Sequence, residues 1–373
     1  MMEELLKRSF RVCLIAAAAF CVLSCESEDP DDPTGVAKIG VVMPTSSSRW
    51  GSVDGPGLAA LFKEAGAECT VLYSEDSVAA EANNVRTIID KDCDVLLITV
   101  VNREDSESAI ASAADAGLTV ILYDRPVMGN TRAHGYVSID NIEIGRRQAE
   151  TLVAAAGSGS ALPLYLYSGA LWDLNSWYFL TGSWEILQPK IADGTFTVKN
   201  SEKAVEYGAV SALSHAQLEE IIGETTTGWN QSTTAPLVAG DLADPSFEAG
   251  AHAFVLAPND LTARVIGDAF RTAGASVTIT GQDGDIASLQ YLLDGKQDMS
   301  VVKRVQTIVA TAADLCVPIA EGESPSFPDT FNNGTKDIPF KSAPMYPVYD
   351  EADIRALVDE GWYQETDFDW PSE

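Results

Sequence analysis

Residues 120–126 read Val-Ile-Leu-Tyr-Asp-Arg-Pro, and this segment is the most informative feature of the chain. Its first four residues are a short apolar run, typical of a strand buried on both faces of a parallel sheet. Asp124 and Arg125 follow at once, and Pro126 ends the strand. Ligands of open α/β sheets bind just beyond such strand ends, where Asp and Arg offer acceptors and a rigid donor fork. A solvated turn is the alternative, but other strands of this chain end the same way.

Short apolar segments alternate with amphipathic segments along most of the chain. Strands are predicted at 38–43, 70–73, 95–100, 120–123, 136–139, 164–167, 253–256, 277–280 and 299–302. Helices are predicted at 57–65, 79–90, 107–116, 142–155, 176–187, 204–223, 261–273, 286–293 and 351–359. This alternation indicates parallel sheets with right-handed crossovers. Because 373 residues are too many for one such sheet, the sequence predicts an α/β protein with two doubly wound parallel-sheet lobes.

The N-terminus has the pattern of an export signal. A short basic region precedes an apolar run, 12–23, that is too short to be a comfortable membrane span. The run ends Val22-Leu23-Ser24-Cys25, which resembles a bacterial lipobox and implies cleavage before Cys25 and a lipid on its sulfur. An ordinary signal peptide with an incidental Cys is the alternative. We therefore expect a lipoprotein signal peptide at 1–25, a flexible acidic tether at 26–36, and a domain anchored on the periplasmic or cell-surface side of a bacterial membrane.

Charge and cysteine content exclude several classes of protein. The net charge is −31, and residues 1–25 contribute +1, which leaves −32 for the rest. Phosphate backbones and anionic lipids would repel such a body, so we expect no nucleic acid partner and no membrane contact except through the anchor. Cys69, Cys93 and Cys316 are an odd number, which argues against a disulfide framework and predicts buried free thiols. No zinc-site spacing is present, and neither a metal nor a cofactor is expected.

Polar residues follow six of the predicted strands. They are Arg49 and Trp50, then Asp124 and Arg125, then Asp173 and Asn175, then Asn259, Asp283 and Lys303. The set contains three cations and three anions, a balance that suits an uncharged polar ligand because a closed site does not tolerate net buried charge. A monosaccharide fits this description, since each hydroxyl both donates and accepts, and each bond to a charged group contributes about 1.5–3 kcal/mol.

In order and spacing, these residues resemble the periplasmic sugar-binding proteins of ABC importers, in particular the xylose-binding and multiple-sugar-binding branch. The matching words are Arg49-Trp50, Tyr123-Asp124-Arg125, Asp140-Asn141, Asp173-Leu174-Asn175, Leu187-Gln188-Pro189, Pro258-Asn259-Asp260, Thr280-Gly281-Gln282-Asp283 and Ser300-Val301-Val302-Lys303. Two of the short motifs depart from the family pattern. Gly51-Ser52-Val53 stands where the family often carries a Lys, and Leu174 interrupts an Asp-Asn-Asn word. Both departures touch the expected pocket, so the resemblance does not identify the sugar.

The resemblance implies a type I periplasmic binding protein fold. Lobe one would comprise 37–139 and 304–339, and lobe two would comprise 140–303 and 340–373. Asp140 and Asn141 would form a hinge, although they could equally cap the helix that follows. Trp229 would stack on the apolar face of a sugar, with Trp50 and Trp172 as other candidates and core packing as the alternative for each. A monomer that delivers a monosaccharide to ABC permease subunits is the implied function, with xylose, galactose, glucose or arabinose as possible ligands.

Three other functions were compatible with parts of this pattern. A sugar sensor would use the same clamp, with its closed form read by a chemoreceptor or sensor kinase. A transcription regulator with this core is disfavoured because an export signal stands in place of a DNA-binding head. An enzyme is disfavoured because the first turn, 44–57, has no G-x-G-x-x-G, and no Walker sequence or Ser–His–Asp grouping is evident. Strand-end carboxylates could in principle act on sugars, so turnover of a bound sugar would revive the enzyme hypothesis.

Overall fold

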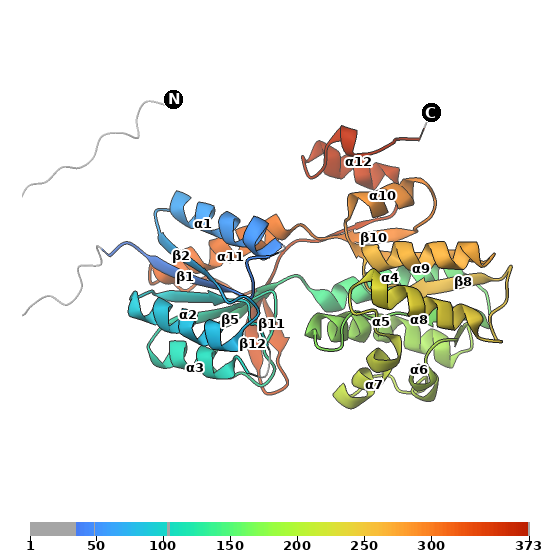
Figure 1. Ribbon diagram of the computed structural model, residues 1–373, viewed down its shortest axis with the longest axis horizontal. Coiled ribbons are helices and arrows are strands. Elements are labelled where there is room, and N and C mark those ends of the chain that lie inside the picture. The colour runs from blue at the N-terminus through green and yellow to red at the C-terminus, as the bar shows by residue number, and fades with distance from the viewer. Residues whose placement is uncertain (1–34, 48, 103–104, 372–373) are drawn as a thin grey trace, which may run out of the picture. The chain divides into compact units, whose positions relative to one another are not determined.

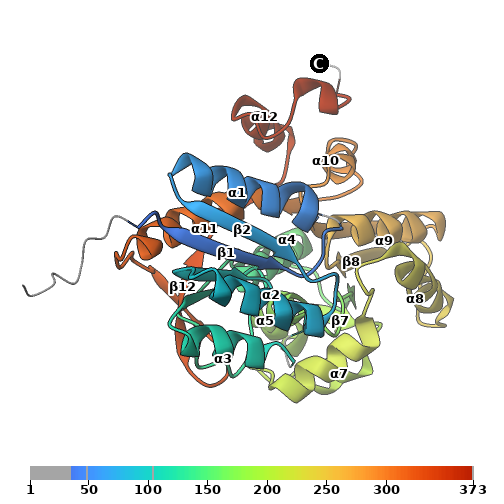
Figure 2. The same ribbon diagram turned by 60° about the vertical axis from the view of Figure 1, so that its left-hand side comes forward.

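Short buried strands alternate with helices in the computed structural model, which describes residues 35–47, 49–102 and 105–371 (Figure 1). The predicted signal peptide, the predicted lipidation site Cys25 and nearly all of the predicted tether lie outside the described residues. The residues from Val36 onward form two sheets, each covered by helices on both faces (Figures 1 and 2).

The first sheet has the strand order β11-β12-β5-β4-β3-β1-β2. Its strands are β1 (Lys38–Met43), β2 (Glu68–Tyr73), β3 (Val95–Ile98), β4 (Thr119–Tyr123), β5 (Gly135–Ser138), β11 (Asp329–Asn332) and β12 (Asp337–Ser342). Neighbouring strands pair in parallel except in the β11–β12 hairpin. The adjacent residues Val41 and Val42 belong to different hydrophobic clusters, because successive side chains of a strand point to opposite faces.

Two helix pairs cover this sheet, as Figures 1 and 2 show. One face carries α1 (Gly55–Glu64) and α11 (Val305–Ala320), and the other carries α2 (Val78–Asp90) and α3 (Glu107–Asp115). Leu58 of α1 and Ile308 of α11 pack with Val41, whereas Val85 of α2 and Ile110 of α3 pack with Val42. A five-residue π-helix, η1 (Trp50–Asp54), precedes α1.

The second sheet has the strand order β13-β10-β9-β8-β6-β7. Its strands are β6 (Leu162–Leu166), β7 (Phe196–Val198), β8 (His252–Leu256), β9 (Ser276–Asp283), β10 (Met299–Val302) and β13 (Tyr346–Val348). The helices of this half are α4 (Asn141–Ala156), α5 (Leu174–Ala192), α6 (Glu202–Glu206), α7 (His215–Thr225), α8 (Gln231–Ala243), α9 (Asp260–Thr272), α10 (Ile286–Leu293) and α12 (Glu351–Asp359), followed by the 3-10 helix η2 (Glu365–Asp367). Leu152 of α4 and Leu180 of α5 pack on one face, and Phe270 of α9 packs on the other.

The chain passes between the two sheets three times. The crossings lie between β5 and α4, between β10 and α11, and between β12 and β13. Each sheet therefore contains segments that are distant in the sequence, as two lobes joined by several crossings require.

Three details of the sequence prediction are corrected. The edge pairs β11–β12 and β10–β13 are antiparallel, so the sheets are mixed rather than wholly parallel. The predicted lobe boundary between 339 and 340 falls inside β12, which pairs with β5 through Ser342; Pro339 is tolerated because that pairing begins only at Phe340. The single helix predicted over 204–223 is two helices, because Ser214 starts α7 afresh with a capping box.

The three cysteines of the described chain are free thiols. Cys93 and Cys316 are buried as predicted, whereas Cys69 is only half-buried. β1 separates β2 from β3, as expected from the strand order. Within the described ranges, no helix is long and apolar enough to cross a membrane, and no group of three or more His, Cys, Asp or Glu residues could hold a metal ion.

Candidate ligand-binding site

One cavity of about 550 Å³ collects the strand-end residues of both sheets. All ten residues predicted to bind ligand line it: Arg49, Trp50, Asp124, Arg125, Asp173, Asn175, Trp229, Asn259, Asp283 and Lys303. Trp172, Phe179 and Gln282 complete the lining. The geometry thus brings together residues that are up to 254 positions apart in the sequence. Their role in binding remains a prediction.

Arg49 is one of two arginines, with Arg125, on the first-sheet side of the cavity. It lies directly before the π-helix η1, a type of helix that occurs frequently at functional sites. Its Nη2 lies 2.9 Å from Oδ1 of Asp124, and its Nε lies 3.7 Å from Oδ2 of Asp54. Burial alone would lower the pKa of Arg49, but the two carboxylates outweigh this effect and raise it. Arg49 therefore stays charged at the wall of the cavity.

Asp54 lies behind Arg49 and is fully buried. The hydroxyl of Tyr123 donates to Oδ1 of Asp54 over 2.8 Å, while Oδ2 has no hydrogen-bond partner in the described chain. Burial raises the pKa of Asp54 to about 6, although Arg49 and the Tyr123 hydroxyl both act to lower it. Asp54 does not line the cavity, so its effect on a ligand would pass through Arg49.

Asp124 occupies a strained turn at the end of β4. Its φ is +62°, and the N–H of Arg125 donates to the carbonyl of Tyr123 over 2.7 Å, which closes a γ-turn around Asp124. The hydroxyls of Tyr136 and Ser138 donate to the Asp124 carbonyl over 2.8 and 3.2 Å and hold the turn in place. The turn directs the Asp124 carboxylate toward Arg49 and the cavity.

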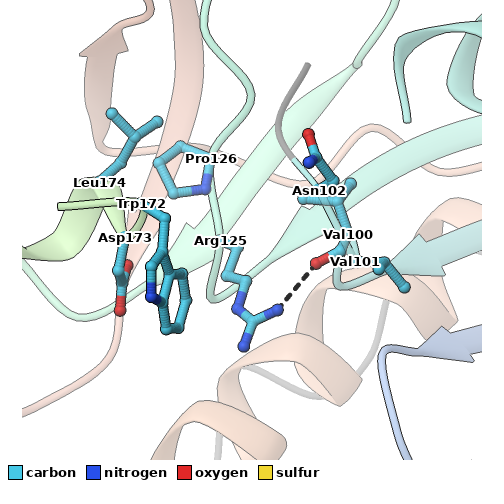
Figure 3. A pocket seen from close by; sticks show the side chains of 8 residues that line it. All are labelled: Val100, Val101, Asn102, Arg125, Pro126, Trp172, Asp173 and Leu174. Atoms are coloured by element: carbon cyan, nitrogen blue, oxygen red, sulfur yellow. Dashed lines mark hydrogen bonds between the residues drawn. The ribbon is translucent and has the colours of Figure 1, made fainter. Parts of the chain in front are cut away.

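Two guanidinium groups flank the ring of Trp50. The Cζ atoms of Arg49 and Arg125 lie 4.1 and 5.5 Å from the ring centroid. Nη1 of Arg125 donates to the carbonyl of Val100 over 3.0 Å (Figure 3). That hydrogen bond holds Arg125, which follows β4, against the loop that follows β3. The end of β3 therefore positions a side chain from the end of β4.

The N-terminus of α5 supplies Asp173 and Asn175. Asp173 is the N-cap of α5, since its Oδ1 accepts from the Asn175 backbone N–H over 2.9 Å. Burial raises the pKa of Asp173, and the Asn175 N–H and the charge of Arg125 oppose that rise. Asn141 Nδ2 donates to Asn175 Oδ1 over 2.8 Å, and Asp140 caps α4 by accepting from the Glu143 N–H. Asp140 thus has the helix-capping role that was the alternative for the predicted hinge pair, whereas Asn141 bonds Asn175 instead. The hinge role of both residues stays a prediction.

Trp229 projects from a loop that is fastened to the end of β6. The hydroxyls of Thr226 and Thr227 donate to the carbonyls of Gly169 and Ser168 over 2.6 and 2.8 Å. A side chain at Gly169 would lie 2.0 Å from the indole of Trp229, so only glycine fits beneath the ring. The ring meets Phe179 edge-on at 6.2 Å, and its buried Nε1 has no partner in the described chain.

Asp283 is the centre of the second-sheet side. Lys303 Nζ lies 3.0 Å from its Oδ1, and Asn259 Nδ2 donates to its Oδ2 over 3.3 Å. Asn259 Oδ1 is occupied at the same time by the N–H and hydroxyl of Thr262, which fixes the orientation of the amide. Asp283 has a φ of +119°, a conformation that L residues rarely adopt.

Asp260 holds the strained turn from beneath. It is fully buried, and its Oδ2 accepts from the backbone N–H groups of Gly284 and Asp285 over 2.9 and 3.0 Å. Gln297 Nε2 and the Ser300 hydroxyl donate to its Oδ1, each over 2.9 Å. Burial, together with the nearby charge of Asp283, raises the pKa of Asp260 to about 7, and the hydrogen bonds oppose this rise.

Backbone strain marks the site independently of side-chain type. Seven non-glycine residues of the described chain have positive φ, and three of them, Asp124, Trp229 and Asp283, line the cavity. Such strain persists where the surrounding structure enforces it, and it clusters at ligand sites. The residue types Asp and Trp do not by themselves predict a positive φ at these three positions, so this strain was not expected from the sequence.

The sequence predicted neither Phe179 and Gln282 as lining residues nor a role for the buried carboxylates Asp54 and Asp260, although Gln282 and Asp260 stand in the quoted motifs. Gln282 Nε2 donates to the Pro258 carbonyl over 2.8 Å, and its Oε1 is buried with no partner in the described chain. Its position directly before Asp283 was the available signal. Trp229 Nε1 is a donor and Gln282 Oε1 an acceptor, so together with three cations and three carboxylates they suit a compact neutral ligand rich in hydroxyl groups.

Solved structures share this architecture. A carbohydrate transporter solute-binding protein from Chloroflexus aurantiacus, in complex with D-glucose, is 38% identical with a TM-score of 0.81 and covers 90% of this chain and 99% of its own. An ABC transporter solute-binding protein from Clostridium phytofermentans, with bound β-D-glucose, is 26% identical with a TM-score of 0.70, over 88% of this chain and 99% of its own. The predicted type I periplasmic binding protein fold is confirmed.

Curated relatives and a family model agree with the structures. The multiple sugar-binding periplasmic receptor of Rhizobium radiobacter is 26% identical over 88% of this chain and 91% of its own length. The D-xylose-binding periplasmic protein of Haemophilus influenzae is 29% identical over 74% of each chain. The resemblance to the xylose-binding and multiple-sugar-binding branch is confirmed by these relatives. The model of the periplasmic binding protein domain matches residues 39–324, and the chain therefore belongs to that family of binding proteins.

Proposed function

We propose that this protein is a lipid-anchored extracytoplasmic solute-binding protein that captures a monosaccharide between its two sheets and delivers it to an ABC sugar permease. One observation carries the proposal. Ten residues from both halves, nine of them at or after strand ends and Trp229 on the loop before α8, line a single cavity in which three cations and three carboxylates balance. A balanced set of fixed charges can pair with hydroxyl groups without leaving a buried charge uncompensated.

The relatives support the ligand class. Two structures with extensive similarity hold D-glucose and β-D-glucose, and the named functions of two curated relatives are binding of multiple sugars and of D-xylose. Binding without turnover agrees with membership in a family of binding proteins. A lipid on Cys25 would keep the protein beside its permease, and Cys25→Ser is expected to release it from the membrane fraction.

A thermal-shift panel tests the sugar assignment. Purified full-length protein is heated with each aldopentose and aldohexose, including xylose, galactose, glucose and arabinose. A ligand at about a thousandfold above its dissociation constant should stabilise the protein by roughly 4 kcal/mol. No shift with any sugar would contradict the proposal.

Arg125→Ala tests the location of the site. We expect this variant to abolish the sugar-induced shift and leave the unliganded melting temperature nearly unchanged, because beside the cavity Arg125 contacts one backbone carbonyl and, at 5.5 Å, the Trp50 ring. Arg132→Ala is the matched control, since Arg132 forms an ion pair with Asp115 and does not line the cavity. Normal sugar binding by Arg125→Ala would show that the site lies elsewhere.

A sensor is the second candidate, and the name of the Rhizobium radiobacter relative as a receptor favours keeping it. Deletion of the partner permease separates the two functions. Loss of sugar uptake supports transport, whereas chemotaxis or gene induction that survives the deletion supports sensing. Both outcomes together would show that one clamp serves both.

A further inference from the structure

A side cavity of about 340 Å³ adjoins the main cavity. Arg125, Trp172 and Asp173 line both, so the two spaces share a wall contributed by both sheets. Figure 3 shows the side chains of Arg125 and Trp172 projecting into the space between the loop after β3 and the start of α5. The side cavity is not needed to explain capture of a single sugar ring.

Trp172 is the unusual residue of this wall. Its side chain is 64% exposed, whereas Trp50, Trp177 and Trp184 are each at most 6% exposed. Ligand pockets are lined predominantly by hydrophobic and aromatic side chains, so a large exposed ring at a cavity wall suits a role in ligand recognition. Its ring offers a flat apolar face, and the apolar residues Val101, Pro126 and Leu174 line the same space.

Among the described residues, the polar groups that line the side cavity are few and balanced. Arg125 and Asp173 supply one charge of each sign, and Asn102 supplies an amide. Apolar side chains with a small number of placed polar groups fit a ligand that has C–H faces and hydroxyl edges. The lack of net charge disfavours an acidic or a basic substituent.

We infer that the side cavity holds the second ring of a neutral disaccharide whose first ring occupies the main cavity, with Trp172 stacked on that second ring. This inference rests on the proposed function and extends its ligand class from monosaccharides to disaccharides. The shared wall supplies the argument for the occupant, because a ligand that leaves the main cavity along Trp172 enters the side cavity directly.

Calorimetric titration of the purified full-length protein tests this inference. Glucose, galactose and xylose are compared with cellobiose, maltose, lactose and xylobiose. We expect at least one disaccharide to bind at least tenfold more tightly than its constituent monosaccharides. If monosaccharides bind and no disaccharide binds more tightly, the inference is overturned while the proposed function stands. If no sugar binds, both fail. If an aryl glycoside binds more tightly than its parent monosaccharide and no disaccharide does, the side cavity holds an aromatic group and the inference is wrong.

Two variants locate the added affinity. Trp172→Ala should lower disaccharide affinity at least tenfold more than monosaccharide affinity. Val101→Phe should fill the side cavity, which Val101 lines, and leave the main cavity, which it does not line. It should therefore remove the disaccharide preference and keep monosaccharide affinity within threefold. Tyr349→Ala, at a side chain that is 46% exposed and outside both cavities, is the control. Equal losses for both ligand classes in Trp172→Ala would overturn the inference.

Discussion

Each half of the cavity has a fully buried carboxylate beneath it, and the two carboxylates are compensated in different ways. Asp54, under the first-sheet half, has a cation 3.7 Å away and one hydroxyl donor. Asp260, under the second-sheet half, accepts only from neutral groups: two backbone N–H groups, an amide and a hydroxyl. Asp54 therefore balances the charge of Arg49, whereas Asp260 holds the backbone that presents Asp283. The role of Asp54 is thus electrostatic, and the role of Asp260 is to fix the backbone geometry of the turn at Asp283.

Removing the Asp260 carboxylate should have the largest effect. Asp260→Ala leaves the Gly284 and Asp285 N–H groups and the Ser300 hydroxyl without this acceptor, while Gln297 Nε2 keeps only the Met299 carbonyl. Each buried unsatisfied group costs about 1–3 kcal/mol, and partial relaxation should leave a net loss of about 3–4 kcal/mol in the free energy of unfolding. Sugar affinity should also fall, because the turn at Asp283 loses its support. Urea unfolding and calorimetry measure the two effects.

Asp260→Asn is the matched control for that prediction. Its Oδ1 can accept from the same backbone N–H groups, and its amide can donate to the Ser300 hydroxyl, which accepts as well as donates. Gln297 Nε2 loses this acceptor but keeps the Met299 carbonyl at 3.0 Å. We expect Asp260→Asn to retain most of the stability and affinity that Asp260→Ala loses. Equal losses in the two variants would refute the claim that Asp260 acts through geometry.

The next largest effect should come from removing a cation, which should cost more stability in the first-sheet half than in the second-sheet half. Arg49→Leu leaves Asp54 buried without its cation, so we expect a loss of about 2 kcal/mol, reduced from the cost of a fully buried pair because the Arg49 side chain is 32% exposed. Lys303→Ala should cost less than about 1 kcal/mol, because Asp283 is 36% exposed. Both variants should lose sugar binding, since both cations line the cavity.

A double variant sharpens this contrast. Asp54→Asn added to Arg49→Leu should restore most of the lost stability without restoring binding, because it removes the unpaired buried charge. A double variant no more stable than Arg49→Leu alone would show that Arg49 stabilises the fold by packing rather than by compensating Asp54.

The sequence predicted the residues that line the cavity better than the residues that support them. Asp124, Asp173 and Asp283 follow buried strands, and a strand end is visible as the point where an apolar run meets polar residues. Asp260 makes its contacts with Gly284 and Ser300, which lie 24 and 40 residues away. Asp54 reaches its position through a π-helix. Neither the tertiary contacts nor the π-helix has a signature in the spacing of residues.

The fold shows the same division. Strongly patterned elements such as β1 and α12 have the predicted bounds. By contrast, α8 was not predicted, because Pro236 lies inside it and it buries only Thr234 and Val238, so its apolar periodicity is weak. The short edge strands β7, β11 and β13 were missed for a related reason. Three or four residues are too few to show an alternating pattern, and only pairing with a neighbour defines them.

The smallest expected effect is a difference between Asp54 and Asp260 in how each makes the free energy of unfolding depend on pH. A carboxyl whose pKa is raised in the folded state binds its proton more tightly there than in the unfolded chain. Stability therefore falls as pH rises from about 4 to the folded pKa and is level above it. The pH range over which stability falls ends at about pH 6 for Asp54 and at about pH 7 for Asp260. Between pH 6 and 7 Asp260 should thus lower the stability by about 1 kcal/mol, and Asp54 should contribute little.

Urea unfolding at pH 5, 6, 7 and 8 compares each Asn variant with the unsubstituted protein. The difference between Asp260→Asn and the unsubstituted protein should keep growing up to pH 7, whereas the difference for Asp54→Asn should level off near pH 6. Working with differences removes the contribution of Asp173 and Glu81, whose pKa values burial also raises. If both differences level off at the same pH, then Arg49 does not hold the pKa of Asp54 below that of Asp260. The ion-paired carboxylate and the carboxylate held by neutral donors would then contribute equally to the pH dependence of stability.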